Sequence, residues 1–180
     1  TKVVTDCLDK VISPTFKMQT KDYKNSGLFP IVDQGQELIA GWTDDANGVI
    51  HSQLPLVVFG DHTRAFKYVD FPFVRGADGT QLLKPVSGII PLFFYYACKA
   101  LDIPARGYNR HFTILKEKEI SFPNNETEQK QIASSLRKVE QAIELQENEL
   151  LSAQELKLAM MRELFTKGLR GEPQKQIEIG

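Results

Sequence analysis

The segment from Glu126 to Lys167 constrains this chain most, because it contains neither proline nor glycine. Its apolar residues recur at alternating steps of three and four, the period of a coiled-coil helix. A helix of about 40 residues is about 60 Å long. A globular domain of about 120 residues has a diameter of roughly 27 Å, taken as twice its radius of gyration. The sequence therefore predicts a long helix whose apolar face needs a partner beyond residues 1–123.

Two heptad series form the predicted seam of this helix. One is Gln129, Leu136, Ile143, Leu150, Lys157 and Leu164, and the other is Ile132, Val139, Gln146, Ala153 and Met160. Eight of these eleven residues are apolar, which favours a coiled coil. The residues expected at a helix–helix interface are Ile132, Leu136, Val139, Ile143, Gln146, Leu150, Ala153, Met160 and Leu164. The polar Gln129, Gln146 and Lys157 are candidates for fixing register, and the alternative is a helix folded back on its own core.

Signals for the ends of the helix lie on both sides of it. Pro123 halts the preceding segment, and Asn124 or Asn125 can cap the exposed amides of the first turn. Gly168 and Gly171 suit left-handed capping turns at the other end. We therefore expect three regions: a globular domain (1–123), the long helix (124–167) and a tail (168–180).

Charge and cysteine usage exclude several classes of protein. Residues 1–123 hold 14 basic and 13 acidic side chains, and residues 124–167 hold 6 and 8, so any DNA surface is a local patch. The two cysteines, far apart and outside any CxxC, indicate no metal framework and are compatible with a reducing cytoplasm. The apolar run at 89–98 is too short to span a bilayer, so no membrane association is expected. No phosphate loop, nucleophile elbow or HExxH motif occurs, so nothing calls for catalysis.

Residues 1–123 predict an α+β domain of short strands. The clearest strand is Leu54–Phe59, a β-branched and aromatic run that Gly60 closes. Further strands are expected at 29–32, 66–73, 112–115 and 119–122, with a helical turn within 5–12. Pro91–Leu101 is an apolar run long enough for a buried helix.

Two polar clusters are the candidate DNA-contacting sites. Gly60-Asp61-His62-Thr63-Arg64 follows the clearest strand, and Arg106-Gly107-Tyr108-Asn109-Arg110-His111 surrounds one glycine. Arginine can bond guanine bidentately and asparagine can do the same with adenine, while Arg, His and Tyr hold phosphates. The alternative is a structural turn in each case. Weaker candidates are Arg75, Lys17, Lys21 and Lys24, which can equally be solvated surface charges.

The chain resembles half of a specificity subunit of type I restriction-modification enzymes. The most specific motifs flank the long helix: Phe122-Pro123 with Glu128-Gln129-Lys130-Gln131-Ile132, and Leu156-Lys157 through Met161-Arg162-Glu163-Leu164-Phe165-Thr166-Lys167-Gly168-Leu169-Arg170-Gly171. Within 1–123, similar segments are Phe29-Pro30-Ile31-Val32, Phe59-Gly60-Asp61-His62-Thr63-Arg64, Gly76-Ala77-Asp78-Gly79 and Arg106-Gly107-Tyr108-Asn109-Arg110-His111-Phe112. The resemblance covers nearly the whole chain.

This resemblance implies a non-catalytic, cytoplasmic DNA-reading module. It implies that 1–123 is a target recognition domain for one half of a split double-stranded DNA site. It also implies docking to methylation subunits and recruitment of a motor-nuclease subunit, in a deoxyribonuclease and adenine methyltransferase complex. S-adenosylmethionine, ATP and Mg are then expected on those partners and not on this chain.

The chain departs from the family pattern because it contains one recognition domain and one helix. It begins with Thr1, which favours a trimmed chain or a piece of a longer protein, and a natural half-subunit is the other reading. For a half-subunit we expect antiparallel homodimerisation through 126–167 and a target of two inverted half-sites. The alternatives are the specificity portion of a fused restriction-methylation enzyme and a coiled-coil interaction adaptor without a DNA role.

Overall fold

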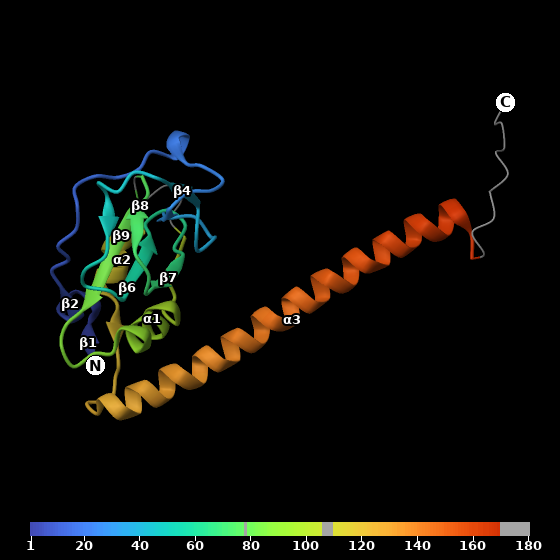
Figure 1. Cartoon of the computed structure of the whole chain (residues 1–180). Helices are drawn as coiled ribbons and strands as arrows, with labels where there is room; N and C mark the ends of the chain where they lie inside the picture. The colour runs from blue at the N-terminus through green and yellow to red at the C-terminus, as the bar shows by residue number, and fades with distance from the viewer. Residues whose placement is uncertain (78, 106–109, 170–180) are drawn as a thin grey trace. The chain divides into compact units, whose positions relative to one another are not determined.

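A computed structural model (Figure 1) describes residues 1–77, 79–105 and 110–169. The chain divides into two compact units, Thr1–Ser134, called the head from here on, and Ser135–Gly180. The predicted α+β class is confirmed: the head combines short strands with short helices. The long helix α3 (Glu126–Lys167) begins in the head and continues into the second unit, with the bounds that the sequence predicts.

Two four-stranded sheets form most of the head, together with one two-stranded pair. The first sheet has the antiparallel order β2 (Leu8–Asp9), β9 (Thr80–Pro85), β6 (Leu56–Gly60), β7 (Phe66–Val69). The second has the order β4 (Gly41–Thr43), β3 (Phe29–Val32), β8 (Phe73–Arg75), β5 (Val49–Ile50), in which only β3 and β8 are parallel. The pair joins β1 (Lys2–Val3) to β10 (Glu119–Ile120). The helices of the head are η1 (Val4–Cys7), η2 (Thr20–Asp22), α1 (Pro91–Lys99) and α2 (His111–Glu117).

Strand β6 is buried along its whole length. Successive side chains of a strand point to opposite faces. Val57 and Phe59 accordingly belong to one apolar cluster, and Leu56 and Val58 belong to another. A strand with both faces covered needs an unbroken apolar run, which explains why this was the clearest strand signal in the sequence.

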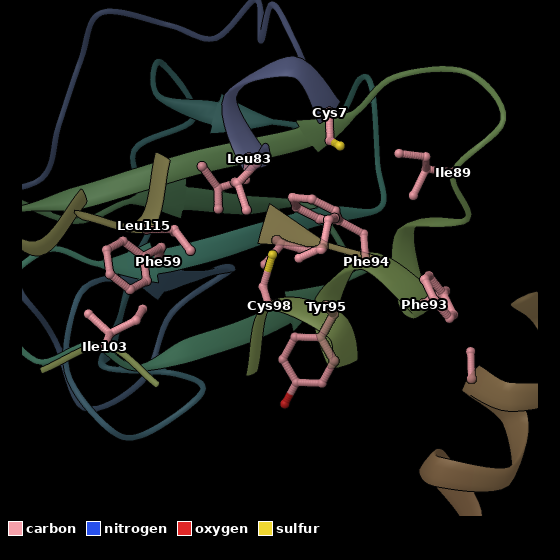
Figure 2. Packing of buried hydrophobic residues seen from close by; sticks show 14 residues of the cluster. Cys7, Phe59, Leu83, Ile89, Phe93, Phe94, Tyr95, Cys98, Ile103 and Leu115 are labelled. Atoms are coloured by element: carbon pink, nitrogen blue, oxygen red, sulfur yellow. The ribbon is translucent and has the colours of Figure 1, made fainter. Parts of the chain in front are cut away.

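The larger apolar cluster joins the helices of the head to the first sheet (Figure 2). Phe94 and Cys98 of α1 and Leu115 of α2 are fully buried against Phe59 and Leu83 of the sheet. The predicted helix at 91–101 is therefore confirmed as α1. Burial raises the pKa of the Cys98 thiol, because the thiolate is disfavoured away from water.

The first turns of α3 are part of the head. The side chain of Asn125 accepts a hydrogen bond from the amide of Thr127 at 2.8 Å, so Asn125 is the cap. Gln129 is fully buried and was wrongly assigned to the exposed seam. Its Nε2 donates to the carbonyls of Gly88 (2.9 Å) and Pro123 (2.8 Å), and its Oε1 accepts from the amide of Ile90 at 2.8 Å. Its polar side chain thus anchors the helix to the head.

The other end of α3 has the predicted glycine cap. Gly168 has a φ of 67°, in the left-handed region that favours glycine, and its amide donates to the carbonyl of Leu164 at 2.9 Å. Gly171 lies outside the described residues. Among the described helices, none combines the length and apolarity needed to cross a membrane.

The segment 112–115, expected as a strand, is part of helix α2. His111 and Leu115 are both buried and lie four residues apart, which is the spacing of one helix face. A four-residue segment with three apolar residues is compatible with either period, and packing within the head decides between them. The expected strand at 119–122 is present as β10 over Glu119–Ile120.

The segment 66–73 contains two strands instead of one. β7 ends at Val69 and β8 begins at Phe73, and the two belong to different sheets. Pro72 in the connection has no amide hydrogen to donate to a sheet ladder, so the chain changes sheets there. The helical turn expected within 5–12 is present as η1 and ends at Cys7, and Ile12 beyond it is 69% exposed.

Candidate nucleic-acid interface

The two predicted polar clusters meet at Asp61. The Asp61 carboxylate accepts a hydrogen bond from the amide of Phe112 at 2.7 Å. Its backbone carbonyl accepts from the amide of His111 at 3.2 Å and lies 2.7 Å from the Nδ1 atom of the same residue. Asp61 is 3% exposed and His111 is 1% exposed. Buried hydrogen bonds of Asp61 and His111 therefore connect the end of β6 to the start of α2.

A tight turn between β6 and β7 presents Arg64. The amide of Gly60 donates to the carbonyl of Ala65 at 2.9 Å, and the amide of Arg64 donates to the carbonyl of Gly60 at 2.8 Å. Arg64 has a φ of 62°, a strained value for a residue with a side chain. Its Nη1 donates to the carbonyl of Ile103 at 2.9 Å, although the residue as a whole is exposed. The Arg64 guanidinium is thus hydrogen-bonded to the protein at one edge, while the residue remains exposed to solvent.

Gln34, which sequence reasoning missed, supports this turn from the loop after β3. Its Oε1 accepts from the amide of His62 at 3.3 Å, and its carbonyl accepts from the hydroxyl of Thr63. A Cβ at Gly60 would lie 2.6 Å from that same carbonyl, so the close approach of the two loops requires glycine there. The available signal was position: residues 33–36 follow β3 as residues 60–64 follow β6.

Arg75 holds a third loop against this site. Its Nε and Nη2 donate to the carbonyl of Thr80 at 3.1 and 2.5 Å, which joins the end of β8 to the start of β9. The amide of Asp61 in turn donates to the carbonyl of Gly79 at 2.7 Å. Burial lowers the pKa of the Arg75 guanidinium, because its charged form loses hydration. Arg75 is half-buried, and its two hydrogen bonds to Thr80 give it a structural role.

A buried cation, Lys67, lies beneath the Gln34 loop. It is 4% exposed, and its Nζ donates to the carbonyl of Asp33 at 2.9 Å and lies 3.7 Å from the carboxylate of that residue. Burial lowers the pKa of Lys67, and the Asp33 carboxylate opposes that shift. The Lys67–Asp33 pair therefore fixes the backbone next to Gln34. The alternating strand pattern that contains Lys67 gave no sign of this role.

A cavity of about 530 Å³ opens beside Arg64. Gln36, Lys99 and Asp102 also line it, so its wall is polar and carries two cations and one carboxylate. The Nζ of Lys99 donates to the hydroxyl of Tyr95 at 3.1 Å and lies 5.3 Å from the centre of that ring. Lys99 and Gln36 are further polar groups at this edge that the sequence did not single out.

The other candidate residues are distributed over the head. Arg110 is exposed and directly precedes buried His111, so it belongs to the same edge as Arg64. Arg106, Tyr108 and Asn109 lie outside the described residues. Lys17 is half-buried next to Met18, whose amide donates to the carbonyl of Arg75 at 3.0 Å. Lys21 is exposed in η2, and the Nζ of Lys24 lies 2.8 Å from the Asp44 carboxylate.

The expected helix–helix interface residues are exposed on α3. Their exposure is 37% for Ile132, 43% for Leu136, 57% for Val139, 53% for Ile143, 59% for Leu150, 53% for Met160 and 41% for Leu164. Gln146 and Ala153 on the same face are also exposed. Exposed apolar residues beside this face form a second stripe, which consists of Leu151, Leu158, Met161 and Phe165. Apolar surface of this extent marks a contact site.

Comparisons with known proteins agree with this architecture. The family described as type I restriction modification DNA specificity domain matches residues 11–154. The type I restriction enzyme EcoR124I/EcoR124II specificity subunit of Escherichia coli is 30% identical over 78 residues, which is 42% of this chain and 19% of that protein. The crystal structure of the type I restriction-modification system S subunit from M. genitalium is similar with a TM-score of 0.61. That match has 19% identity and covers 91% of this chain and 45% of the other, so it shows the fold. Each match spans less than half of the relative's length.

Proposed function

Because this chain belongs to the family of type I restriction modification DNA specificity domains, we propose that it reads one half of a bipartite DNA target. Residues 1–123 act as the recognition domain, 124–167 as the spacer and dimerisation helix, and 168–180 as a tail. The chain supplies recognition, and a methylation subunit and a motor-nuclease subunit supply the chemistry. The observation that carries this proposal is the hydrogen-bonded junction at Asp61, which joins the first polar cluster to His111 of the second.

Within this edge we assign two kinds of role. Arg64 and Arg110 are exposed and contact bases or phosphates, as do His62 and Thr63 of the same turn as Arg64. Residues 106–109, which lie outside the described residues, and Lys17 are further candidates for DNA contact. Asp61 and His111 are buried and hold the loops that present these residues. Arg75 is half-buried and holds the start of β9 through the carbonyl of Thr80. Fixed loops with exposed arginines suit base reading, because direct readout needs donors held in a defined geometry.

Replacing Arg64 or Arg110 with alanine is expected to weaken DNA binding by the assembled methyltransferase. Loss of a bidentate base contact costs about 1–3 kcal/mol and relaxes the preference at one base pair. Loss of a phosphate contact weakens all sequences equally and reduces the salt dependence of binding. Binding titrations on cognate and substituted DNA at several salt concentrations distinguish the two.

A matched control for these variants is Lys2→Ala, which removes an exposed cation from the separate β1–β10 pair. This variant should bind as the unaltered protein does. If Arg64→Ala and Arg110→Ala also bind as the unaltered protein does, the assignment of the reading surface is wrong.

The exposed seam of α3 pairs with an antiparallel helix, from a second copy or from the second half of a longer chain. Antiparallel pairing makes the two recognition sites inverted, and the helix length then sets the spacer between them. A helix of 42 residues is about 63 Å long. The second stripe (Leu151, Leu158, Met161 and Phe165) lies beside the seam and provides a docking face for the methylation subunit.

The decisive experiment is co-purification with the methylation subunit from the same genome, followed by mapping of protected adenines. We expect a stable complex and methylation at two inverted half-sites separated by a fixed number of base pairs. A chain that forms its helix pair but neither retains a methylation subunit nor directs methylation would instead be an interaction adaptor.

A further inference from the structure

The part of α3 outside the head carries a seam with polar residues at Gln146 and Lys157, and at Lys167 in the last turn. In an antiparallel pair of helices, each core layer joins one position of the first heptad series to one of the second. In a two-fold symmetric pair every such layer occurs twice. Choosing the residue that faces Gln146 therefore fixes the register of the whole pair.

Building on the proposed pairing of α3, we infer that the occupant of this seam is a second copy of the chain, in the register that places Gln146 opposite Lys157. The other layers are then Ile143 with Met160, Leu150 with Ala153, Val139 with Leu164 and Leu136 with Lys167. Three kinds of layer, Ile143–Met160, Leu150–Ala153 and Val139–Leu164, are then wholly apolar, and Lys167 lies at the helix end where its ammonium group can reach solvent. An ammonium group has donors only, and the carbonyl oxygen of the Gln146 side chain is an acceptor that it can meet.

Sliding the second copy by one heptad loses this match in either direction. One shift places Gln146 against Leu150 and Lys157 against Val139. The opposite shift places Gln146 against Leu164 and Lys157 against Ala153. Both shifts press an amide and an ammonium group against apolar side chains, which is unfavourable without a hydrogen-bond partner.

The charges beside the seam favour the same register. Antiparallel helices bring together flanking positions of the same kind from the two copies. In the inferred register Glu147 faces Gln154, Glu140 faces Met161, Glu149 faces Leu156 and Glu163 faces Ala142. No carboxylate there meets a nearest neighbour of like charge.

The two shifted registers do bring carboxylates together. One places Glu147 opposite its own symmetry copy and Glu149 opposite its own copy. The other places Glu149 opposite Glu163 twice. Like charges across an interface are repulsive and select against that arrangement. The absence of like-charge repulsion and the polar layer thus favour the same register independently.

The extent of the free helix agrees with this choice. The symmetry axis of the inferred pair passes between Leu151 and Ser152, and the part of α3 outside the head, Ser135–Lys167, has Leu151 at its middle. Leu136, the first seam residue outside the head, faces Lys167, the last residue of the helix. The pair therefore covers the whole seam that the head leaves free.

Site-directed cross-linking of the full chain tests this register. Gln146→Cys and Lys157→Cys are prepared separately, mixed and oxidised or bridged with a short bismaleimide. The native Cys7 and Cys98 are fully buried, and burial raises the pKa of both thiols, so the introduced thiols react first. We expect a covalent dimer on a non-reducing gel from the mixture and none from either variant alone.

Two control mixtures test the two registers that are shifted by one heptad. One combines Gln146→Cys with Leu150→Cys, and the other combines Lys157→Cys with Ala153→Cys. Cross-linking in a control but not in the first mixture overturns the register and leaves the pairing intact. Cross-linking of Gln146→Cys with itself shows a parallel pair, and a dimer that cross-links in no mixture also overturns the register. A monomer at high micromolar concentration by sedimentation overturns the proposed pairing itself.

Discussion

Replacing Ile143 and Leu150 together with glutamate is expected to convert the α3 dimer into a monomer. Both side chains are more than half exposed in the single chain and lie in the middle of the seam. Burying one such side chain contributes about 1.5–3 kcal/mol. The symmetric pair loses four of them, and each is already close to half covered in the single chain, so the loss is about 3–6 kcal/mol and the dissociation constant should rise by about 10²–10⁴-fold. Sedimentation equilibrium over a micromolar concentration series measures this change.

Leu145→Glu is the matched control for this experiment. Leu145 is 58% exposed on the same helix but lies off both heptad series, so its replacement should leave the dimer intact. Circular dichroism should show a folded head in all variants, because Ile143 and Leu150 belong to the second unit. A double variant that remains dimeric would show that the seam is not the contact surface.

Replacing Asp61 with alanine is expected to destabilise the head and disorder the reading edge together. The Asp61 carboxylate is nearly fully buried and accepts from the amide of Phe112 at 2.7 Å. Removing a charged acceptor leaves that amide without its partner, at a cost of about 2–3 kcal/mol in the free energy of unfolding. This corresponds to a fall of roughly 6–12 °C in the melting temperature. Differential scanning calorimetry measures the fall.

Two variants separate the hydrogen bond from the charge. Asp61→Asn keeps an oxygen that can accept from the amide of Phe112, so it should lose about half as much stability. Asp70→Ala removes an exposed carboxylate just after β7 and should change the free energy of unfolding by less than about 0.5 kcal/mol. A melting temperature of Asp61→Ala equal to that of Asp70→Ala would contradict the role assigned to Asp61.

Local patterns predicted some elements of the fold and misassigned others. β6 and α3 were correct because each has a long, unambiguous apolar period that its surroundings reinforce. The segment 112–115 was expected as a strand, because three apolar residues in four fit both periods, and packing into the cluster that contains Phe59 and Leu83 selects the helix. Gln129 matched the heptad spacing of the seam, yet three hydrogen bonds to the head determine its place. Spacing identifies a helix face but does not identify what covers it.

The candidate site divides in a similar way. Sequence alone drew attention to Asp61, Arg64 and His111, because polar side chains gathered at strand ends and around glycine. It gave no account of Gln34, whose contacts with His62 and Thr63 connect residues 28 and 29 positions apart. Such contacts depend on the packing that brings together the loops after β3 and β6, which are strands of different sheets, and that packing is a property of the folded chain.

The sequence by itself determined the family, the α+β class, and the length and heptad spacing of α3, because motifs and periodicity are local and do not depend on tertiary contacts. Only the tertiary structure decided which members of the polar clusters are buried supports and which are exposed. Asp61 and Arg64 are three residues apart, yet one is withdrawn into hydrogen bonds with α2 and the other is exposed. Burial is decided by which distant segments pack on each residue, and no local pattern records that.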